Sequence, residues 1–218
     1  MAQGLPFPRI IPRIVRAFLS RRLSGGSHAG NFGIEMGEDS VLQTPRHVTG
    51  GRYIRIGDRS LVSSNGCLSA YDKCESVPYR PQISIGNDVY IGGFSTITCI
   101  SRIAIGDGCI MSEFVYLSDH AHGMNPEAGL ISKQALVSKG DVTIGEHTFV
   151  GYQACILSGV KLGKHCVVGA NSVVTRSFPD FSMVAGAPAR LIKVYSFEHH
   201  EWIPASQEGS LSVLSGEK

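Results

Sequence analysis

The chain contains 218 residues, of which 43% are hydrophobic and 17% charged, and its formal net charge is +2. This composition is typical of a globular domain and argues against a disordered or a membrane-embedded chain. So small a positive charge, without a stripe of basic and aromatic residues, also argues against nucleic acid as a partner.

Residues 1–30 are expected to form a basic amphipathic helix and a linker. Five arginines alternate with aliphatic residues within residues 5–23. Such a helix suits the end of a solenoid, whose open core needs a cover, or an anionic membrane surface. We expect the covering role and keep peripheral membrane contact through residues 5–23 as the alternative.

The middle of the chain carries an aliphatic residue at every sixth position, in four runs. A period of six is that of neither an α-helix nor an amphipathic strand. The runs are Ile56, Val62, Leu68; Ile85, Ile91, Ile97; Ile105, Met111, Leu117; and Ile144, Val150, Ile156, Leu162, Val168, Val174. A second inward position is expected four residues after each aliphatic, as at Ala154 and Cys166. The pattern predicts a solenoid of short strands, in which glycine after the aliphatic permits the bend.

The repeat is interrupted at three places, where we expect extruded chain. The breaks run from Leu68 to Ile85, from Ile97 to Ile105 and from Leu117 to Ile144, with spacings of 17, 8 and 27 residues. Loops on a rigid scaffold often carry chemistry, and the last break contains His120 and His122.

The repeat stops after Val184, so residues 31–195 are expected to form the repeat domain and residues 196–218 a tail, mobile or docked on a neighbour. The six cysteines show no CxxC spacing, and no cleavable signal peptide with a long apolar segment is evident. Reduced thiols in a cytoplasmic protein are the simplest interpretation.

The hexads, the histidine-bearing loop 119–123 and the closing sequence VAGAPARLIK at 184–193 together resemble the hexapeptide-repeat acyltransferases. Over roughly residues 50–195 the chain looks most like the sugar and polysaccharide O-acetyltransferases, which include maltose, galactoside, capsule and O-antigen acetyltransferases. The resemblance implies an all-β solenoid, a left-handed parallel β-helix. It also implies a homotrimer with acetyl-CoA in clefts between subunits, and no required metal.

The resemblance places the catalytic base at His122. A sugar hydroxyl becomes a good nucleophile only as its proton is removed, and histidine suits that role near neutral pH. Asp119 is a candidate to orient an imidazole, although a backbone carbonyl could do the same. His120 is a candidate for acceptor binding, for support of His122 or for no function.

The resemblance also places an oxyanion-stabilising backbone amide at Tyr152. Phe149 stands where related enzymes often have tryptophan, and an apolar wall is expected there. Backbone groups are expected to bind the pantetheine arm and cations the phosphates. The expected CoA-binding residues are Phe149, Gly151, Tyr152, Gly169, Ala170, Arg176, Arg190 and Lys193.

The expected function is O-acetylation of a saccharide, in bacterial surface polysaccharide biosynthesis at the cytoplasmic face of the membrane. Alternatives are a xenobiotic or serine acetyltransferase, a non-catalytic scaffold and a γ-class carbonic anhydrase. The last needs three zinc-binding histidines. His147 and His165, eighteen residues apart, are expected only to stack on successive coils.

Overall fold

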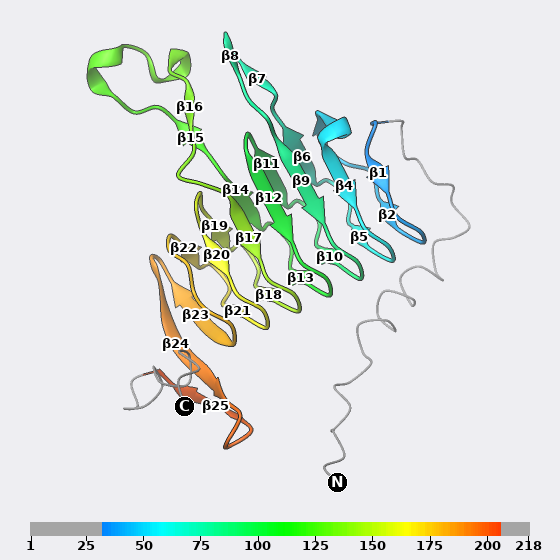
Figure 1. Cartoon of the computed structure of the whole chain (residues 1–218), viewed down its shortest axis with the longest axis vertical. Coiled ribbons are helices and arrows are strands. Elements are labelled where there is room, and N and C mark those ends of the chain that lie inside the picture. The colour runs from blue at the N-terminus through cyan, green and yellow to red at the C-terminus, as the bar shows by residue number, and fades with distance from the viewer. Residues whose placement is uncertain (1–31, 206–218) are drawn as a thin grey trace.

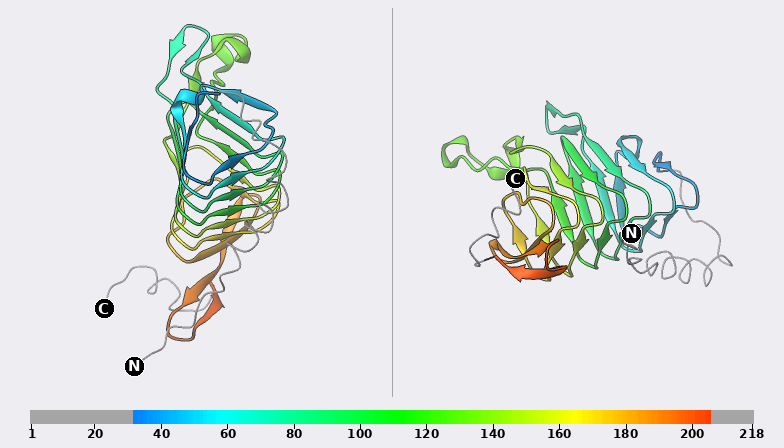
Figure 2. Two further views of the ribbon diagram at one scale, coloured as in Figure 1. Left: turned by 90° about the vertical axis from the view of Figure 1, so that its right-hand side faces the viewer. Right: turned by 60° about the horizontal axis from the view of Figure 1, so that its bottom comes forward.

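The structure is a computed structural model and describes residues 32–205. Short strands form three parallel sheets that the chain visits in turn, so that each circuit adds one strand to each sheet. The coils stack on one another as a prism (Figures 1 and 2). This is the solenoid of short strands that the hexads predict, with the parallel β-helix arrangement that the resemblance implies.

Within each sheet the strands stack in chain order. The first sheet contains β1 (Glu35–Met36), β4 (Ile54–Ile56), β9 (Gln82–Ile85), β12 (Arg102–Ile105), β17 (Val142–Ile144) and β20 (Lys161–Leu162). The second contains β2 (Val41–Leu42), β5 (Leu61–Val62), β10 (Tyr90–Ile91), β13 (Ile110–Met111), β18 (Phe149–Val150), β21 (Val167–Val168), β23 (Ser182–Gly186), β24 (Ala189–Ser196) and β25 (Glu201–Pro204). The third contains β3 (His47–Thr49), β6 (Cys67–Ala70), β11 (Thr96–Cys99), β14 (Tyr116–Ser118), β19 (Cys155–Ile156) and β22 (Val173–Val174). A short 3-10 helix, η1 (Gly51–Tyr53), joins β3 to β4.

Both inward positions of the hexad are confirmed. Every aliphatic in the four runs is at most 3% exposed, and they pack in one continuous core. The second inward position is also buried, at Ala154 and Cys166 among others. Burial raises the pKa of the Cys166 thiol to about 11, so this cysteine acts as a small packing residue.

The glycine after the aliphatic has a different role from the predicted one. The residue with positive φ at the corner between the first and second sheets is His147 (58°), two positions after Gly145. At Gly145 itself, an added Cβ would overlap the carbonyl carbon of Gly163 in the next coil. Glycine is therefore required there by the close approach of successive coils and not by the bend.

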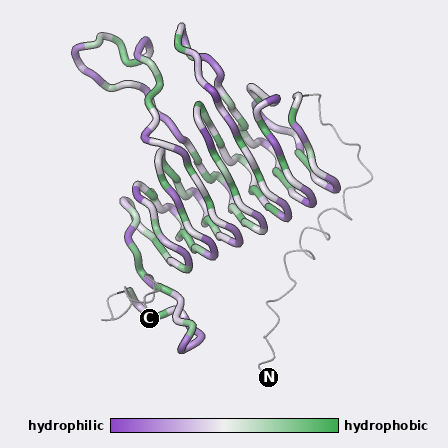
Figure 3. The backbone as a smooth tube through the Cα atoms, in the orientation of Figure 1, coloured by the Kyte–Doolittle hydropathy of each residue, from purple (hydrophilic) through white to green (hydrophobic). Residues whose placement is uncertain are grey.

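The corners between the first and second sheets are hydrophilic (Figure 3), and a ladder of side chains joins successive coils along them. In each rung a side-chain oxygen accepts a hydrogen bond from a backbone N–H at the equivalent position of the preceding coil. The rungs are Asp58 to the N–H of Glu38, Asn87 to that of Asp58, Asp107 to that of Asn87, and Asp180 to that of Lys164, at 2.8–2.9 Å.

Two of the three breaks extrude chain, as predicted. The first forms the hairpin of β7 (Lys73–Cys74) and β8 (Val77–Pro78), and the third forms the ribbon of β15 (Ala121–His122) and β16 (Leu136–Val137). The ribbon's far end carries 3-10 helices η2 (Pro126–Ala128) and η3 (Ile131–Lys133). The hairpin and the ribbon project from the same side of the solenoid (Figure 1). The prediction for the second break is wrong, because its two extra residues only widen the corner between β11 and β12.

The predicted end of the β-helix at residue 195 needs correction. Strand β24 runs to Ser196 and pairs with both β23 and β25 in antiparallel fashion, extending the second sheet. Residues 196–204 thus dock on their own chain. The basic helix predicted at 5–23 and the rest of the tail, 206–218, lie outside the described residues. Within residues 32–205, no helix has the length and apolar character needed to cross a bilayer.

Candidate functional site

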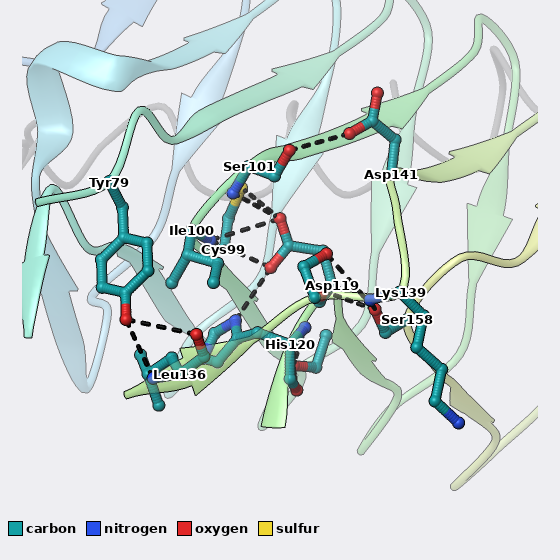
Figure 4. A network of polar contacts seen from close by, with 12 residues as sticks. Tyr79, Cys99, Ile100, Ser101, Asp119, His120, Leu136, Lys139, Asp141 and Ser158 are labelled. Carbon is teal, nitrogen blue, oxygen red and sulfur yellow. Dashed lines mark hydrogen bonds and ion pairs between the residues drawn. The ribbon is translucent and has the colours of Figure 1, made fainter. Parts of the chain in front are cut away.

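The root of the histidine-bearing loop is fixed by a buried carboxylate. Asp119 is fully buried and follows β14 directly. Its carboxylate accepts backbone N–H groups from Ile100 at 2.9 Å and Ser101 at 2.7 Å, and it lies 2.8 Å from Nδ1 of His120 (Figure 4). Burial opposes ionisation of Asp119, but the hydrogen bonds from His120 and these N–H groups outweigh burial and lower its pKa.

The second break in the hexads explains how this carboxylate is held. The two extra residues between β11 and β12 are Ile100 and Ser101, whose N–H groups both point at Asp119. Sequence reasoning missed this role and predicted a loop instead. The eight-residue spacing was the signal that could have revealed it.

Asp119 and His120 form a carboxylate–imidazole pair. The His120 side chain is only 9% exposed, and its ring lies edge-on to Tyr71 with the centroids 6.2 Å apart. An ionised carboxylate at Nδ1 favours a proton on that nitrogen, which leaves Nε2 as the acceptor. The side chain that Asp119 orients in this structure is therefore His120.

His122 is exposed and lies two residues beyond this pair. It ends β15, where it is the register partner of Leu136 in β16. One residue, Ala121, separates His122 from His120 at the loop root. The loop thus presents one nearly buried and one exposed imidazole close together.

The residues predicted to bind the donor cluster on another corner of the prism. Gly151 and Tyr152 follow β18, and Gly169 and Ala170 follow β21, the neighbouring strand in the next coil. The two turns lie so close that an added Cβ on Gly151 would overlap the amide of Ala170. Within residues 32–205, none of the described groups accepts a hydrogen bond from the Tyr152 N–H. The Tyr152 residue is 42% exposed.

The remaining predicted donor residues lie in three places. Phe149 lies on β18 beside this corner and is 41% exposed. Arg190 and Lys193 lie on β24 and pair with Ala185 and Met183 of β23. Arg176 instead follows β22 on the far side of the third sheet, where its guanidinium lies 5.1 Å from the ring centre of Phe178.

The proposed base and the proposed oxyanion donor do not meet within one chain. Tyr152 lies where the chain enters the third sheet, before β19, whereas the loop carrying His122 leaves the third sheet after β14. The strands of that sheet separate the two corners.

The two histidines weighed as metal ligands do stack, as their spacing predicts. The rings of His147 and His165 lie 4.9 Å apart, and Phe181 continues the stack at 5.3 Å from His165. Burial and the nearby charges of His147 and Lys164 lower the pKa of His165. Among the described residues, no three His, Cys, Asp or Glu side chains are grouped closely enough to hold a metal ion.

Comparison with known proteins identifies the relatives of this architecture. A family profile described as the hexapeptide repeat of succinyl-transferase matches residues 82–112 and 141–176. A protein of Escherichia coli K12, named for O-acetyl transfer in lipopolysaccharide biosynthesis, is 30% identical over 168 residues, which cover 74% of this chain and 82% of that protein. A Mycobacterium tuberculosis protein named as an acetyltransferase is 29% identical over 66% of this chain, which spans only 43% of that relative's length.

Solved structures agree on the fold. An N-acyltransferase of Bacillus cereus in complex with dTDP and 3-hydroxybutyryl-CoA superposes with a TM-score of 0.62. The identity is 18%, and the match covers 84% of this chain and 90% of that one. Together with the parallel strands described above, this likeness identifies the solenoid as a left-handed β-helix.

Proposed function

The chain belongs to the hexapeptide-repeat acyltransferases, and on that premise we propose that it moves an acetyl group from acetyl-CoA to a hydroxyl of a saccharide. The observation that carries the proposal is the extruded loop, which presents the exposed His122 beside the buried Asp119–His120 pair. The extent of the match to the E. coli relative named for O-acetyl transfer supports the reaction class.

In the proposed reaction His122 acts as the general base. Its imidazole takes the proton of the acceptor hydroxyl while that oxygen attacks the thioester carbonyl carbon. The Tyr152 N–H stabilises the negative charge that develops on the carbonyl oxygen. The carbon–sulfur bond then breaks, and the CoA thiolate leaves with the proton that the imidazole returns. Asp119 and His120 support the loop root and the acceptor side of the site.

Donor binding is assigned to the corner that carries Tyr152. Gly151, Gly169 and Ala170 offer backbone partners to the pantetheine arm, and Phe149 offers an apolar wall. Arg190 and Lys193 on β24 supply positive charge for the phosphates. Arg176 lies apart from them within one chain, so its contribution requires the groove between two subunits.

The active unit is proposed to be a homotrimer with a site in each intersubunit cleft. The separation of His122 from Tyr152 within one chain supports this arrangement. So does the outer face of the second sheet, whose outward positions carry aliphatic or aromatic side chains. They are Tyr90, Ile110, Phe149, Val167 and Met183, in register with one another. The corresponding positions of the first sheet include Arg55 and Lys161.

The acceptor is proposed to be a polysaccharide or a lipid-linked saccharide, acetylated in the cytoplasm at the inner face of the membrane. The name of the E. coli relative supports a surface polysaccharide. The basic stretch at 5–23 supports contact with an anionic surface. A serine or xenobiotic acceptor is the alternative outcome of the same assay.

Mass spectrometry of candidate acceptors incubated with acetyl-CoA tests the proposal, because a mass gain of one acetyl group reports donor and acceptor together. We expect His122→Asn to lower the rate by about 10² to 10⁴-fold while CoA still binds. His200→Asn, which replaces an exposed histidine near the C-terminal hairpin, is the matched control and should leave the rate unchanged. A loss below about threefold in the His122 variant would contradict its role as the base.

A further inference from the structure

The two extruded segments dock on each other, although they arise from different coils. We call residues 71–81 the hairpin segment and residues 119–141 the histidine loop. Both project from the same side of the solenoid (Figure 2). Their central contact is the Tyr79 hydroxyl, which accepts a hydrogen bond from the N–H of Leu136 at 2.9 Å and donates one to the carbonyl of the same residue at 3.2 Å (Figure 4).

Leu136 is the residue directly across the ribbon from His122. A single hydroxyl thus holds both backbone polar groups of the residue that pairs with His122. The β15–β16 ribbon has only two residues in each strand, and an isolated two-stranded ribbon is marginally stable in water. Its position therefore depends on anchors outside the ribbon.

The ribbon is also anchored at its root, on both sides of the loop. Asp119 is held by Ile100 and Ser101, and the hydroxyl of Ser158 donates to the Asp119 carbonyl at 2.6 Å. The same hydroxyl accepts a hydrogen bond from the N–H of Lys139 at 2.8 Å. These contacts fix where the loop leaves and rejoins the prism, and Tyr79 adds a contact farther out, on β16 itself.

We propose that Tyr79 is a positioning residue for acetyl transfer, which sets the direction of the His122 side chain by gripping Leu136. This inference rests on the proposed function. Tyr79 acts through the backbone of the ribbon and does not touch the reacting atoms. A second contact between the segments, from Lys133 to Glu75 at 3.2 Å, joins side chains that are 67% and 52% exposed and contributes little.

The test is Tyr79→Phe, which removes the hydroxyl and keeps the ring. Loss of the hydrogen bond should speed exchange of the Leu136 amide hydrogen by about tenfold. It should lower kcat by about tenfold or more with an unchanged KM for acetyl-CoA, because a misdirected base slows the transfer step and not donor binding. Glu75→Gln, which removes the charge of the surface contact between the same segments, should change neither measurement.

The outcomes separate this inference from the function on which it rests. Unchanged exchange at Leu136 in the Tyr79 variant would overturn the grip itself. Faster exchange with an unchanged kcat would overturn the positioning role in an active enzyme. A wild-type protein with no transfer to any acceptor would remove the proposed function, and with it the catalytic meaning of Tyr79, while the exchange result would still report the contact.

Discussion

Asp119 shows how a single charged group can be buried at an otherwise apolar end of a β-strand. Its carboxylate is satisfied by two backbone N–H groups and by His120, so the cost of removing it from water is offset by charge-assisted hydrogen bonds. The neighbouring Cys99 thiol also contacts it at 3.2 Å, and burial together with the negative charge of Asp119 raises the pKa of that thiol.

This environment predicts an acid-sensitive contribution to stability. Because the pKa of Asp119 is lower in the folded chain than in the unfolded one, its contribution is complete above the unfolded pKa of about 4 and is lost as the pH falls toward the folded value. We expect Asp119→Asn to lower the free energy of unfolding by about 2 kcal/mol at pH 7, and to reduce the further loss on acidification.

Urea unfolding at pH 7 and below pH 4 measures both effects. Asp141→Asn is the matched control. Among residues 32–205 that carboxylate accepts a hydrogen bond only from the hydroxyl of Ser101, at 2.9 Å, so its loss should have a smaller effect. Identical pH dependence in wild type and Asp119→Asn would show that the buried carboxylate contributes nothing through its ionisation.

At the scale of one residue, the sequence identified Asp119, His120 and His122 as a group but not their connections. The prediction that Asp119 orients an imidazole left open which ring it contacts. That choice depends on the direction of the chain after β14, which Ile100 and Ser101 set from another coil. Contacts of this kind depend on stacking between coils, and local residue patterns do not encode them.

Strands of two to four residues are the repeating element, and their stability comes from burial between coils. Ile144 on β17 is 1% exposed and is stacked in register between Ile105 and Leu162. Its neighbour Thr143 faces outward on the same strand. The inward and outward positions of one strand can therefore be compared directly.

We expect Ile144→Ala to lower the free energy of unfolding by about 2–5 kcal/mol, because it leaves a cavity between two stacked coils. Thr143→Ala should cost less than about 1 kcal/mol. Calorimetric or denaturant unfolding of both variants measures the difference. Equal effects would mean that the hexad aliphatics do not carry the stability of the coil.

The elements were predictable to the extent that they obey the period of six. All four runs of aliphatics were located from sequence, and so were the two projecting segments. The role of the hexad glycine and the shape of the second break were not. Both depend on distances between neighbouring coils, such as that between Gly145 and Gly163, which a one-dimensional pattern does not contain.

On the scale of the whole molecule, the faces formed by the first and second sheets differ in character. Ile110 on the second sheet and Ala104 on the first occupy outward positions of the same coil. Ile110 lies between Tyr90 and Phe149, whereas Ala104 lies between Ser84 and Thr143. A continuous apolar face on a globular domain is typical of an interface between subunits.

We therefore expect Ile110→Asp to dissociate the proposed trimer, because it places a charge in the centre of that face. Sedimentation velocity should report a trimer for the wild type and a monomer for the variant, with loss of acetyl transfer. Ala104→Asp should remain a trimer. A monomeric wild-type protein, or a trimer that tolerates the charge at position 110, would contradict the proposed interface.

The ladder of corner side chains makes the two ends of the solenoid unequal. In each rung the acceptor comes from the later coil and the donor from the earlier one. Shortening the protein from its amino-terminal side removes each donor before the acceptor that serves it. Every backbone donor in the coils that remain therefore keeps its acceptor. Shortening it from the carboxyl-terminal side removes acceptors first and leaves a backbone donor without its partner on the newly exposed coil. Internal duplication or excision of whole coils should accordingly be tolerated best when each backbone donor at the new junction is still followed by a coil that carries its side-chain acceptor.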